Sequence, residues 1–236
     1  MGAWRSNFRR RNAMANEIHI EEFSSKEELF ARCSESILLD IQQSFLQNNQ
    51  CSVLLSGGST PEPLYNLLAE NKELVSDVQW GLVDERFVDT SSEYSNEKMI
   101  REALGNDVKV VGMVSDSSNY TTNLIQINDR YKSFIEQTNI SILGMGVDGH
   151  FASLFPGDES SEKILNSNEK AIFNTSAPSF PEQRITCSFQ MIIDCQSIYL
   201  IITGQTKKDI LVATELNLPI HKLLAKRNDI KIYYAD

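Results

Sequence analysis

The sequence predicts a single α/β domain, with helices on both faces of a doubly wound, mostly parallel sheet. Apolar strand-like runs alternate with helical segments along the 236 residues, and the connections between them are short. Runs such as "SIYLII" are apolar at consecutive positions, which indicates strands that are buried on both faces. In such sheets ligands bind beyond the carboxyl ends of the strands, so a site is expected there.

The first predicted elements are a strand, a helix, and a strand that leads into a second helix. "IHIEEF" (18–23) has the composition of a strand, and Ser24 and Ser25 each precede a glutamate by three residues, the spacing of a capping box. The helix that should follow carries apolar residues at three- and four-residue steps as far as Phe45. "CSVLLSGGSTP" (51–61) then predicts a strand, a glycine loop and a helix with proline in its first turn.

The alternation continues to the end of the chain. The remaining predicted elements are a strand in "VQWGLVDERF", a helix around 93–104, a strand in "VKVVGM", a helical stretch at about 120–137, a strand in "NISILGMG", a strand in "SIYLIITG", a helix from about Gln205 and a final strand in "IKIYYAD".

The first 14 residues differ from the rest, with four arginines, no acidic residue and no apolar segment typical of a secretory signal. We interpret 1–14 as a leader or an added segment before a second start at Met14, and assign 15–236 to the domain.

Composition argues against several classes of partner. The formal net charge is -10, whereas nucleic-acid-binding domains usually carry an excess of basic residues. No apolar stretch approaches the roughly 20 residues that span a bilayer. The four cysteines show neither CxxC spacing nor a neighbouring histidine pair, so we expect reduced thiols in a cytoplasmic protein. The oligomeric state is left open.

A glycine loop after the second predicted strand is the first candidate binding site. Ser56, Gly57, Gly58, Ser59 and Thr60 end a strand and open a helix, where backbone N–H groups, hydroxyls and the positive helix end favour an anion. The loop is neither GxxxxGK[ST] nor GxGxxG, so it indicates a phosphate rather than a nucleotide. A tight turn without a ligand is the alternative.

A second candidate lies in "GMGVDGH", where Asp148 and His150 flank a glycine at a tight turn after a strand. A neutral imidazole can accept a proton near pH 7 and return it. The alternatives are a packed or surface histidine, and an aspartate that caps the turn.

The segments "SGGSTP", "DERFVDTSSEYSN", "LGMGVDGHFASLFPG", "PEQRIT" and "GQTK", in this order, resemble the family of 6-phosphogluconolactonases. The resemblance implies hydrolysis of 6-phosphoglucono-1,5-lactone in the oxidative pentose phosphate pathway. The partner would be this phosphorylated sugar lactone, and no metal or organic cofactor would be needed.

The resemblance also implies roles for individual residues. His150 would be the general base and Asp148 would orient it. Arg86, Arg184 and Lys207 are the cations expected to bind or polarise the substrate, and Arg184 and Lys207 are expected to form the phosphate site with the glycine loop. Asp84 would bind substrate hydroxyls or hold Arg86.

The related glucosamine-6-phosphate deaminases share the phosphate loop and the DGH triplet, but have a glutamate where this chain has Phe155. A phenyl ring cannot transfer the proton that opens the amino sugar, so the lactonase interpretation is favoured. A deaminase or isomerase, and a non-catalytic sugar-phosphate-binding protein, remain as alternatives.

Overall fold

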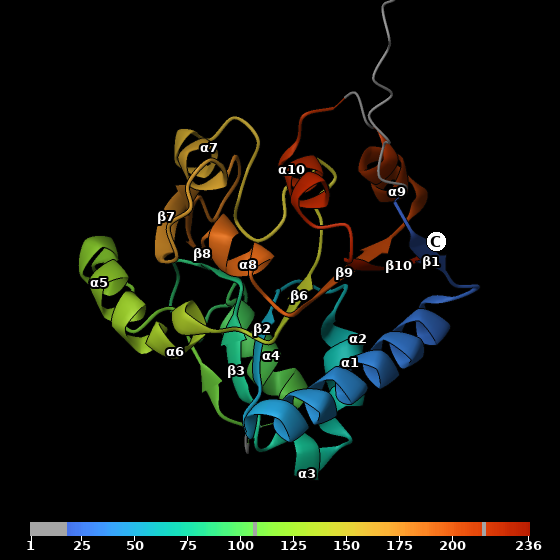
Figure 1. Ribbon diagram of the computed structural model, residues 1–236. Helices are drawn as coiled ribbons and strands as arrows, with labels where there is room; N and C mark the ends of the chain where they lie inside the picture. Colours follow the sequence, from blue (N-terminus) through green and yellow to red (C-terminus); the bar gives the residue numbers. More distant parts are fainter. Residues whose placement is uncertain (1–17, 106–107, 214–215) are drawn as a thin grey trace, which may run out of the picture.

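The computed structural model describes residues 18–105, 108–213 and 216–236 (Figure 1). The strands among them are β1 (Ile20–Glu22), β2 (Ser52–Leu55), β3 (Gln79–Leu82), β4 (Asp84–Arg86), β5 (Val110–Val111), β6 (Ile140–Leu143), β7 (Ile172–Ser176), β8 (Gln183–Cys187), β9 (Ser197–Thr203) and β10 (Lys231–Ala235).

The helices are α1 (Lys26–Asn48), α2 (Glu62–Ala69), α3 (Lys72–Val75), α4 (Asn96–Leu104), α5 (Tyr120–Arg130), α6 (Lys132–Glu136), α7 (Glu159–Leu165), α8 (Phe189–Ile193), α9 (Gln205–Val212) and α10 (Pro219–Lys226).

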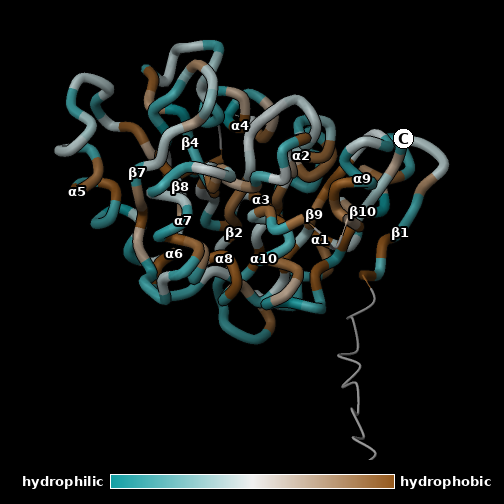
Figure 2. Tube along the Cα trace, turned by 90° about the horizontal axis from the view of Figure 1, so that it is seen from above, coloured by the Kyte–Doolittle hydropathy of each residue, from teal (hydrophilic) through white to brown (hydrophobic). Residues whose placement is uncertain are grey.

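Seven strands form one parallel sheet in the order β1-β10-β9-β6-β2-β3-β5. Figure 1 shows α1 and α2 on one side of this sheet and α8 and α10 on the other, which confirms the predicted doubly wound α/β fold. Every residue of β2 and β6 is buried, as expected for strands covered on both faces. In Figure 2 the hydrophobic positions accordingly lie along interior strands such as β2 and β9.

Helix α1 begins where the capping-box spacing predicts. Ser25 has an extended backbone and its side chain accepts a hydrogen bond from the backbone N–H of Glu28, while Glu28 accepts from Ser24 in return. Leu29, Cys33 and Ile37 on the apolar face of the helix are fully buried.

Two predicted elements are divided in the structure. The helical stretch at 120–137 is broken at Tyr131, whose buried hydroxyl donates to the carbonyl of Val111 instead of facing solvent. "VQWGLVDERF" is not one strand, because β3 ends at Leu82 and the chain then leaves the parallel sheet to form β4.

Strand β4 belongs to a separate three-stranded antiparallel sheet in the order β4-β8-β7, which the sequence analysis did not predict. Neither β7 nor β8 has the long apolar run of the main strands, and each pairs only within the small sheet. This sheet carries the "DER" and "PEQRIT" segments to the same place.

All four cysteines are buried as free thiols. No helix in the described ranges is both long and apolar enough to cross a membrane. The predicted leader, 1–14, lies outside the described residues.

Candidate active site

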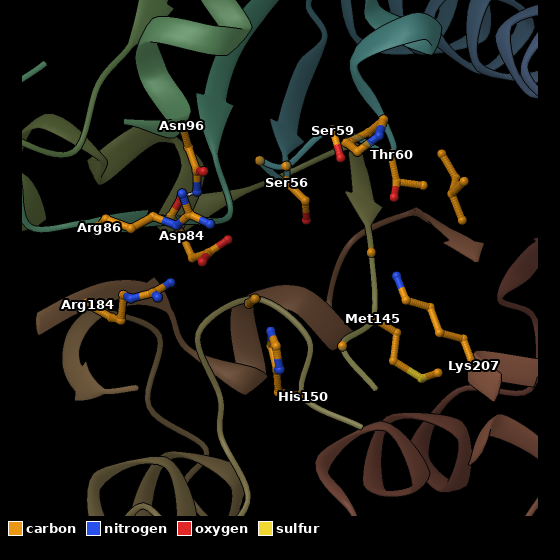
Figure 3. Close-up of a pocket in the computed structure, with 17 residues that line it drawn as sticks. Ser56, Ser59, Thr60, Asp84, Arg86, Asn96, Met145, His150, Arg184 and Lys207 are labelled. Carbon is orange, nitrogen blue, oxygen red and sulfur yellow. Dashed lines mark hydrogen bonds between the residues drawn. The ribbon is translucent and has the colours of Figure 1, made fainter. Parts of the chain in front are cut away.

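A pocket of about 250 Å³ opens beyond the carboxyl ends of the parallel strands, where the sequence analysis expected a site (Figure 3). Loops after β2, β6 and β9 form part of its wall, and the small sheet, the first residue of α4 and strand β9 also contribute. The lining residues are Ser56, Gly57, Gly58, Ser59, Thr60, Pro61, Asp84, Arg86, Asn96, Gly144, Met145, Gly146, His150, Ala152, Arg184, Ile201 and Lys207. Every predicted site residue except Asp148 is among them.

The glycine loop joins β2 to α2 and is held in place by Tyr65 of α2. The buried Tyr65 hydroxyl donates to the carbonyl of Ser56 at 2.7 Å. The Oγ of Ser56 is buried but has no hydrogen-bond partner among the described residues. A buried polar atom without a partner is costly, so this hydroxyl is poised to bind a ligand in the pocket.

Lys207 lies in the first turn of α9, and Figure 3 shows it on the same side of the pocket as Ser59 and Thr60. It takes part in none of the ion pairs within the described part of the chain. Burial lowers the pKa of Lys207, because the charged amine loses part of its hydration there. An anion at the glycine loop would offset that loss.

His150 is held at the end of the turn that follows β6. Gly149 has a φ of +76°, and a Cβ at this position would lie 2.6 Å from Leu218, so only glycine fits without strain. Across this glycine, His150 Nδ1 and Asp148 Oδ1 are 2.5 Å apart. With Nδ1 engaged, Nε2 is the ring nitrogen that remains available to a substrate or water.

Asp148 stays ionised in this arrangement. Partial burial acts to raise its pKa, but the hydrogen bond and charge of His150 outweigh burial and hold the pKa of Asp148 below the ordinary value. A carboxylate in contact with Nδ1 fixes the tautomer of the ring and stabilises its protonated form.

Phe155 forms an apolar wall beside the histidine. Its ring centroid is 4.7 Å from that of His150, and the guanidinium carbon of Arg184 lies 5.6 Å from the same phenyl centroid. Phe155 is buried, so no carboxylate occupies this position next to the imidazole.

Arg86 and Arg184 are direct partners across the antiparallel pair β4–β8, and their side chains therefore extend from the same face of the small sheet. Burial lowers the pKa of Arg184, and the neighbouring charge of Arg86 lowers it further. The Nε of Arg86 is buried without a partner among the described residues. Figure 3 shows both arginines across the pocket from Lys207, so Arg184 and Lys207 do not form one cluster.

Asp84 lies beside the two arginines and is buried. One of its carboxylate oxygens accepts from Ser153 Oγ at 2.6 Å, which fixes its direction. The carboxylate offsets part of the positive charge on this side of the pocket, in contrast to the side that carries Lys207.

Asn96 is a lining residue that the sequence analysis missed, although it ends the quoted segment "DERFVDTSSEYSN". Its side-chain amide donates to the backbone carbonyl of Asp84 at 3.0 Å. A Cβ on Gly57 would lie 1.8 Å from Asn96 Oδ1, so the amide packs directly against the glycine loop. Asn96 thus joins the loop to the small sheet, a contact that sequence spacing does not reveal.

The pocket therefore combines one acid-base group with cations on two sides. Within the described ranges, no three His, Cys, Asp or Glu side chains are grouped as ligands of a metal ion. The arrangement can take a proton from water, stabilise negative charge beside the histidine and bind a separate anionic group.

Comparison with known proteins identifies the family of the chain. The family model described as glucosamine-6-phosphate isomerases/6-phosphogluconolactonase matches residues 24–230. A protein named 6-phosphogluconolactonase from Helicobacter pylori is 30% identical over 204 residues, which cover 80% of this chain and 86% of the relative.

Solved structures show the same fold. The crystal structure of a 6-phosphogluconolactonase from Shewanella baltica is 27% identical, with a TM-score of 0.86 over 93% of this chain and 98% of that one. The 6-phosphogluconolactonase from Trypanosoma cruzi is 26% identical, with a TM-score of 0.79 over 94% of this chain and 96% of that one.

Proposed function

We propose, because the chain belongs to the family of glucosamine-6-phosphate isomerases and 6-phosphogluconolactonases, that its pocket hydrolyses 6-phosphoglucono-1,5-lactone to 6-phosphogluconate. The observation that carries the proposal is the contact between His150 and Asp148 in a pocket that also holds a glycine loop and three cations. This reaction belongs to the oxidative pentose phosphate pathway.

His150 acts as the general base in this mechanism. Its Nε2 takes a proton from a water molecule while the water oxygen attacks the lactone carbonyl carbon, C1. When the tetrahedral intermediate collapses, the bond between C1 and the ring oxygen breaks and the imidazolium returns the proton to that oxygen. One such group contributes about 10²- to 10⁴-fold, and Asp148 stabilises the imidazolium between the two steps.

Arg86 and Arg184 stabilise the negative charge that develops on the carbonyl oxygen. Both guanidinium groups lie on the side of the pocket that also holds Asp84 (Figure 3). Asp84 reduces the net charge there and makes this side less suited to a phosphate dianion. We therefore assign these arginines to the lactone end of the substrate and Asp84 to its hydroxyl groups.

The phosphate of the substrate binds at the opposite side, between the loop Ser56–Thr60 and Lys207. Support comes from the Ser56 hydroxyl that lacks a partner among the described residues and from the lysine that is unpaired within that same part of the chain. Among the described residues, no acidic side chain lines the pocket at this end. This differs from a single anion site that includes Arg184, and the two assignments predict different selectivities.

Deamination of glucosamine 6-phosphate is the competing reaction of the family. It needs a second group beside the histidine that can exchange a proton with the ring oxygen, and Phe155 fills that position with a phenyl ring. Lactone hydrolysis needs no second group if His150 serves both proton transfers. A non-catalytic sugar-phosphate-binding protein would require no base in contact with Asp148.

The test is a paired assay on one protein preparation. Freshly made 6-phosphogluconolactone should disappear faster with the protein than without it, at a pH low enough to slow spontaneous hydrolysis, and glucosamine 6-phosphate should release no ammonia. Catalytic ammonia release with untouched lactone would establish the deaminase instead. Binding of 6-phosphogluconate with neither reaction would establish the non-catalytic alternative.

A cytoplasmic location and the assignment of 1–14 to a leader are also part of the proposal. Four buried thiols without a disulfide are compatible with a reducing compartment. Fractionation of the source cells, with mass determination of the native chain, would test both.

A further inference from the structure

Two exposed aromatic rings contact each other just outside the pocket. Tyr94 is 48% exposed and Phe180 is 72% exposed, which is unusual for large aromatic side chains. Their ring centroids are 5.2 Å apart and the planes are perpendicular, the favourable edge-to-face arrangement. Tyr94 lies in the loop between β4 and α4, and Phe180 lies in the loop between β7 and β8.

Each of these loops also anchors one arginine of the pocket through a backbone carbonyl. Arg86 Nη1 donates to the carbonyl of Tyr94 at 2.7 Å, and Arg184 Nε donates to the carbonyl of Pro181, next to Phe180, at 2.7 Å. The positions of both guanidinium groups therefore depend on the same two loops that the aromatic contact joins.

The arginines need such anchoring because they repel each other. Arg86 and Arg184 are paired across two strands, and neither forms an ion pair within the described part of the chain. Asp84 offsets only part of their charge, so the two adjacent cations still tend to separate toward solvent. Carbonyl acceptors on joined loops oppose that separation.

We propose that the contact between Tyr94 and Phe180 positions Arg86 and Arg184 for the substrate by holding their two anchoring loops together. The proposal rests on the proposed function, since it concerns the arginines assigned there to the lactone end. The two rings are positioning residues, because neither lines the pocket.

The experiment compares Phe180→Ala, Tyr94→Ala and the double variant in lactone hydrolysis. Each single change removes the contact but leaves the anchoring carbonyls in the chain, and it should lower kcat/KM by about 2- to 10-fold, the range expected for one aromatic pair. The double variant should be no worse than either single variant. Ile125→Ala, which removes an equally exposed side chain from α5, is the control and should leave kcat/KM unchanged.

A second comparison separates positioning from general stability. In an Arg86→Ala, Arg184→Ala background, Phe180→Ala should cause no further loss, because the groups it positions are absent. If Phe180→Ala lowers kcat/KM in that background as much as in the wild type, the proposal is wrong. It is also wrong if Phe180→Ala keeps the wild-type kcat/KM, or if the losses of the two single variants multiply in the double variant.

The same variants can be assayed without catalysis by measuring 6-phosphogluconate binding calorimetrically. If the wild-type protein hydrolyses no lactone, the proposed function fails, yet the aromatic contact is still tested by this affinity. The positioning role is supported if Phe180→Ala and Tyr94→Ala weaken the affinity in the wild type and Phe180→Ala does not weaken it further in the background without the arginines. Equal affinities in all variants contradict the positioning role.

Discussion

The loops of the seven-stranded sheet and the strands of the three-stranded sheet face each other across the pocket, and they carry positive charge in different ways. On the loop side, Lys207 has no ion pair within the described part of the chain, and burial lowers its pKa. On the strand side, Arg86 and Arg184 are fixed by strand register, anchored to carbonyls and partly offset by Asp84. A pocket with a single lysine on one side and two anchored arginines on the other suits a substrate with different demands at its two ends.

The largest expected effect lies between these two sides, at the base. His150→Ala should lower kcat by about 10²- to 10⁴-fold, because the change removes the imidazole that takes the proton from water and that Asp148 supports. Steady-state kinetics on the lactone, with circular dichroism to verify folding, measures it. His19→Ala, which removes an exposed histidine, is the matched control. A folded His150→Ala protein that retains most of its turnover would remove His150 from the mechanism.

The strand side gives the next effect. Arg184→Ala should lower kcat by about 10- to 150-fold, the loss expected when a charge-assisted contact disappears. Arg184→Lys keeps the charge but not the planar fork, so it should restore activity only in part. Rapid-quench or continuous assays at saturating lactone give kcat directly. An unchanged kcat with a raised KM would move Arg184 to the phosphate site.

Replacement of the carboxylate behind the base should have a smaller effect. Asp148→Asn should lower kcat by about 10-fold, the low end for a charged hydrogen bond, because both side chains are about one-third exposed. The pKa of Asp148 is lowered in the folded protein, so its charge persists above that pKa and is lost as the pH falls through it. The two proteins should therefore be compared at neutral pH, where Asp148 is ionised and its charge supports the imidazolium formed during the reaction. Equal kcat values for the wild type and Asp148→Asn at that pH would contradict this assignment.

On the loop side, we expect Lys207 to affect the affinity for 6-phosphogluconate. At 100 times Kd, 6-phosphogluconate should stabilise the protein by about 2.7 kcal/mol and raise Tm by several degrees. Its affinity should fall as the pH rises through the pKa of Lys207, because only the charged amine attracts phosphate. Burial lowers that pKa, so the fall should begin below the ordinary lysine value of about 10.4. Thermal shift and calorimetry across this range, with Lys207→Ala as control, check it; identical pH dependence in both proteins would exclude Lys207.

The two sides also differ in how far the sequence could predict them. The loop side follows from local signals, since a glycine loop or a turn at the end of an apolar strand must emerge at one edge of a parallel sheet. That rule placed the segments of Ser56–Thr60, His150 and Lys207 at one edge of the sheet, and the family resemblance supplied the roles of His150 and Lys207; all of these residues line the pocket.

The strand side depends on contacts between distant segments. The pairing of Arg86 with Arg184 requires β4 to leave the main sheet at Val83 and join β8. Neither short strand has a hydrophobic pattern in its sequence that predicts this pairing. Asn96 was missed for a similar reason, because its role arises from contact with Gly57 rather than from its neighbours in the chain. The family resemblance located these segments, but their register came from tertiary structure.

The central claim is that the loop side binds phosphate while the strand side serves the lactone, and substrate selectivity tests it most directly. The kcat/KM for 6-phosphogluconolactone and for unphosphorylated glucono-1,5-lactone would be measured with the wild-type protein, Lys207→Ala and Arg184→Ala. We expect the wild type to prefer the phosphorylated lactone by roughly 10- to 150-fold. Lys207→Ala should lose most of this preference, and Arg184→Ala should keep it while hydrolysing both lactones more slowly. A preference that survives Lys207→Ala and collapses in Arg184→Ala would contradict the account.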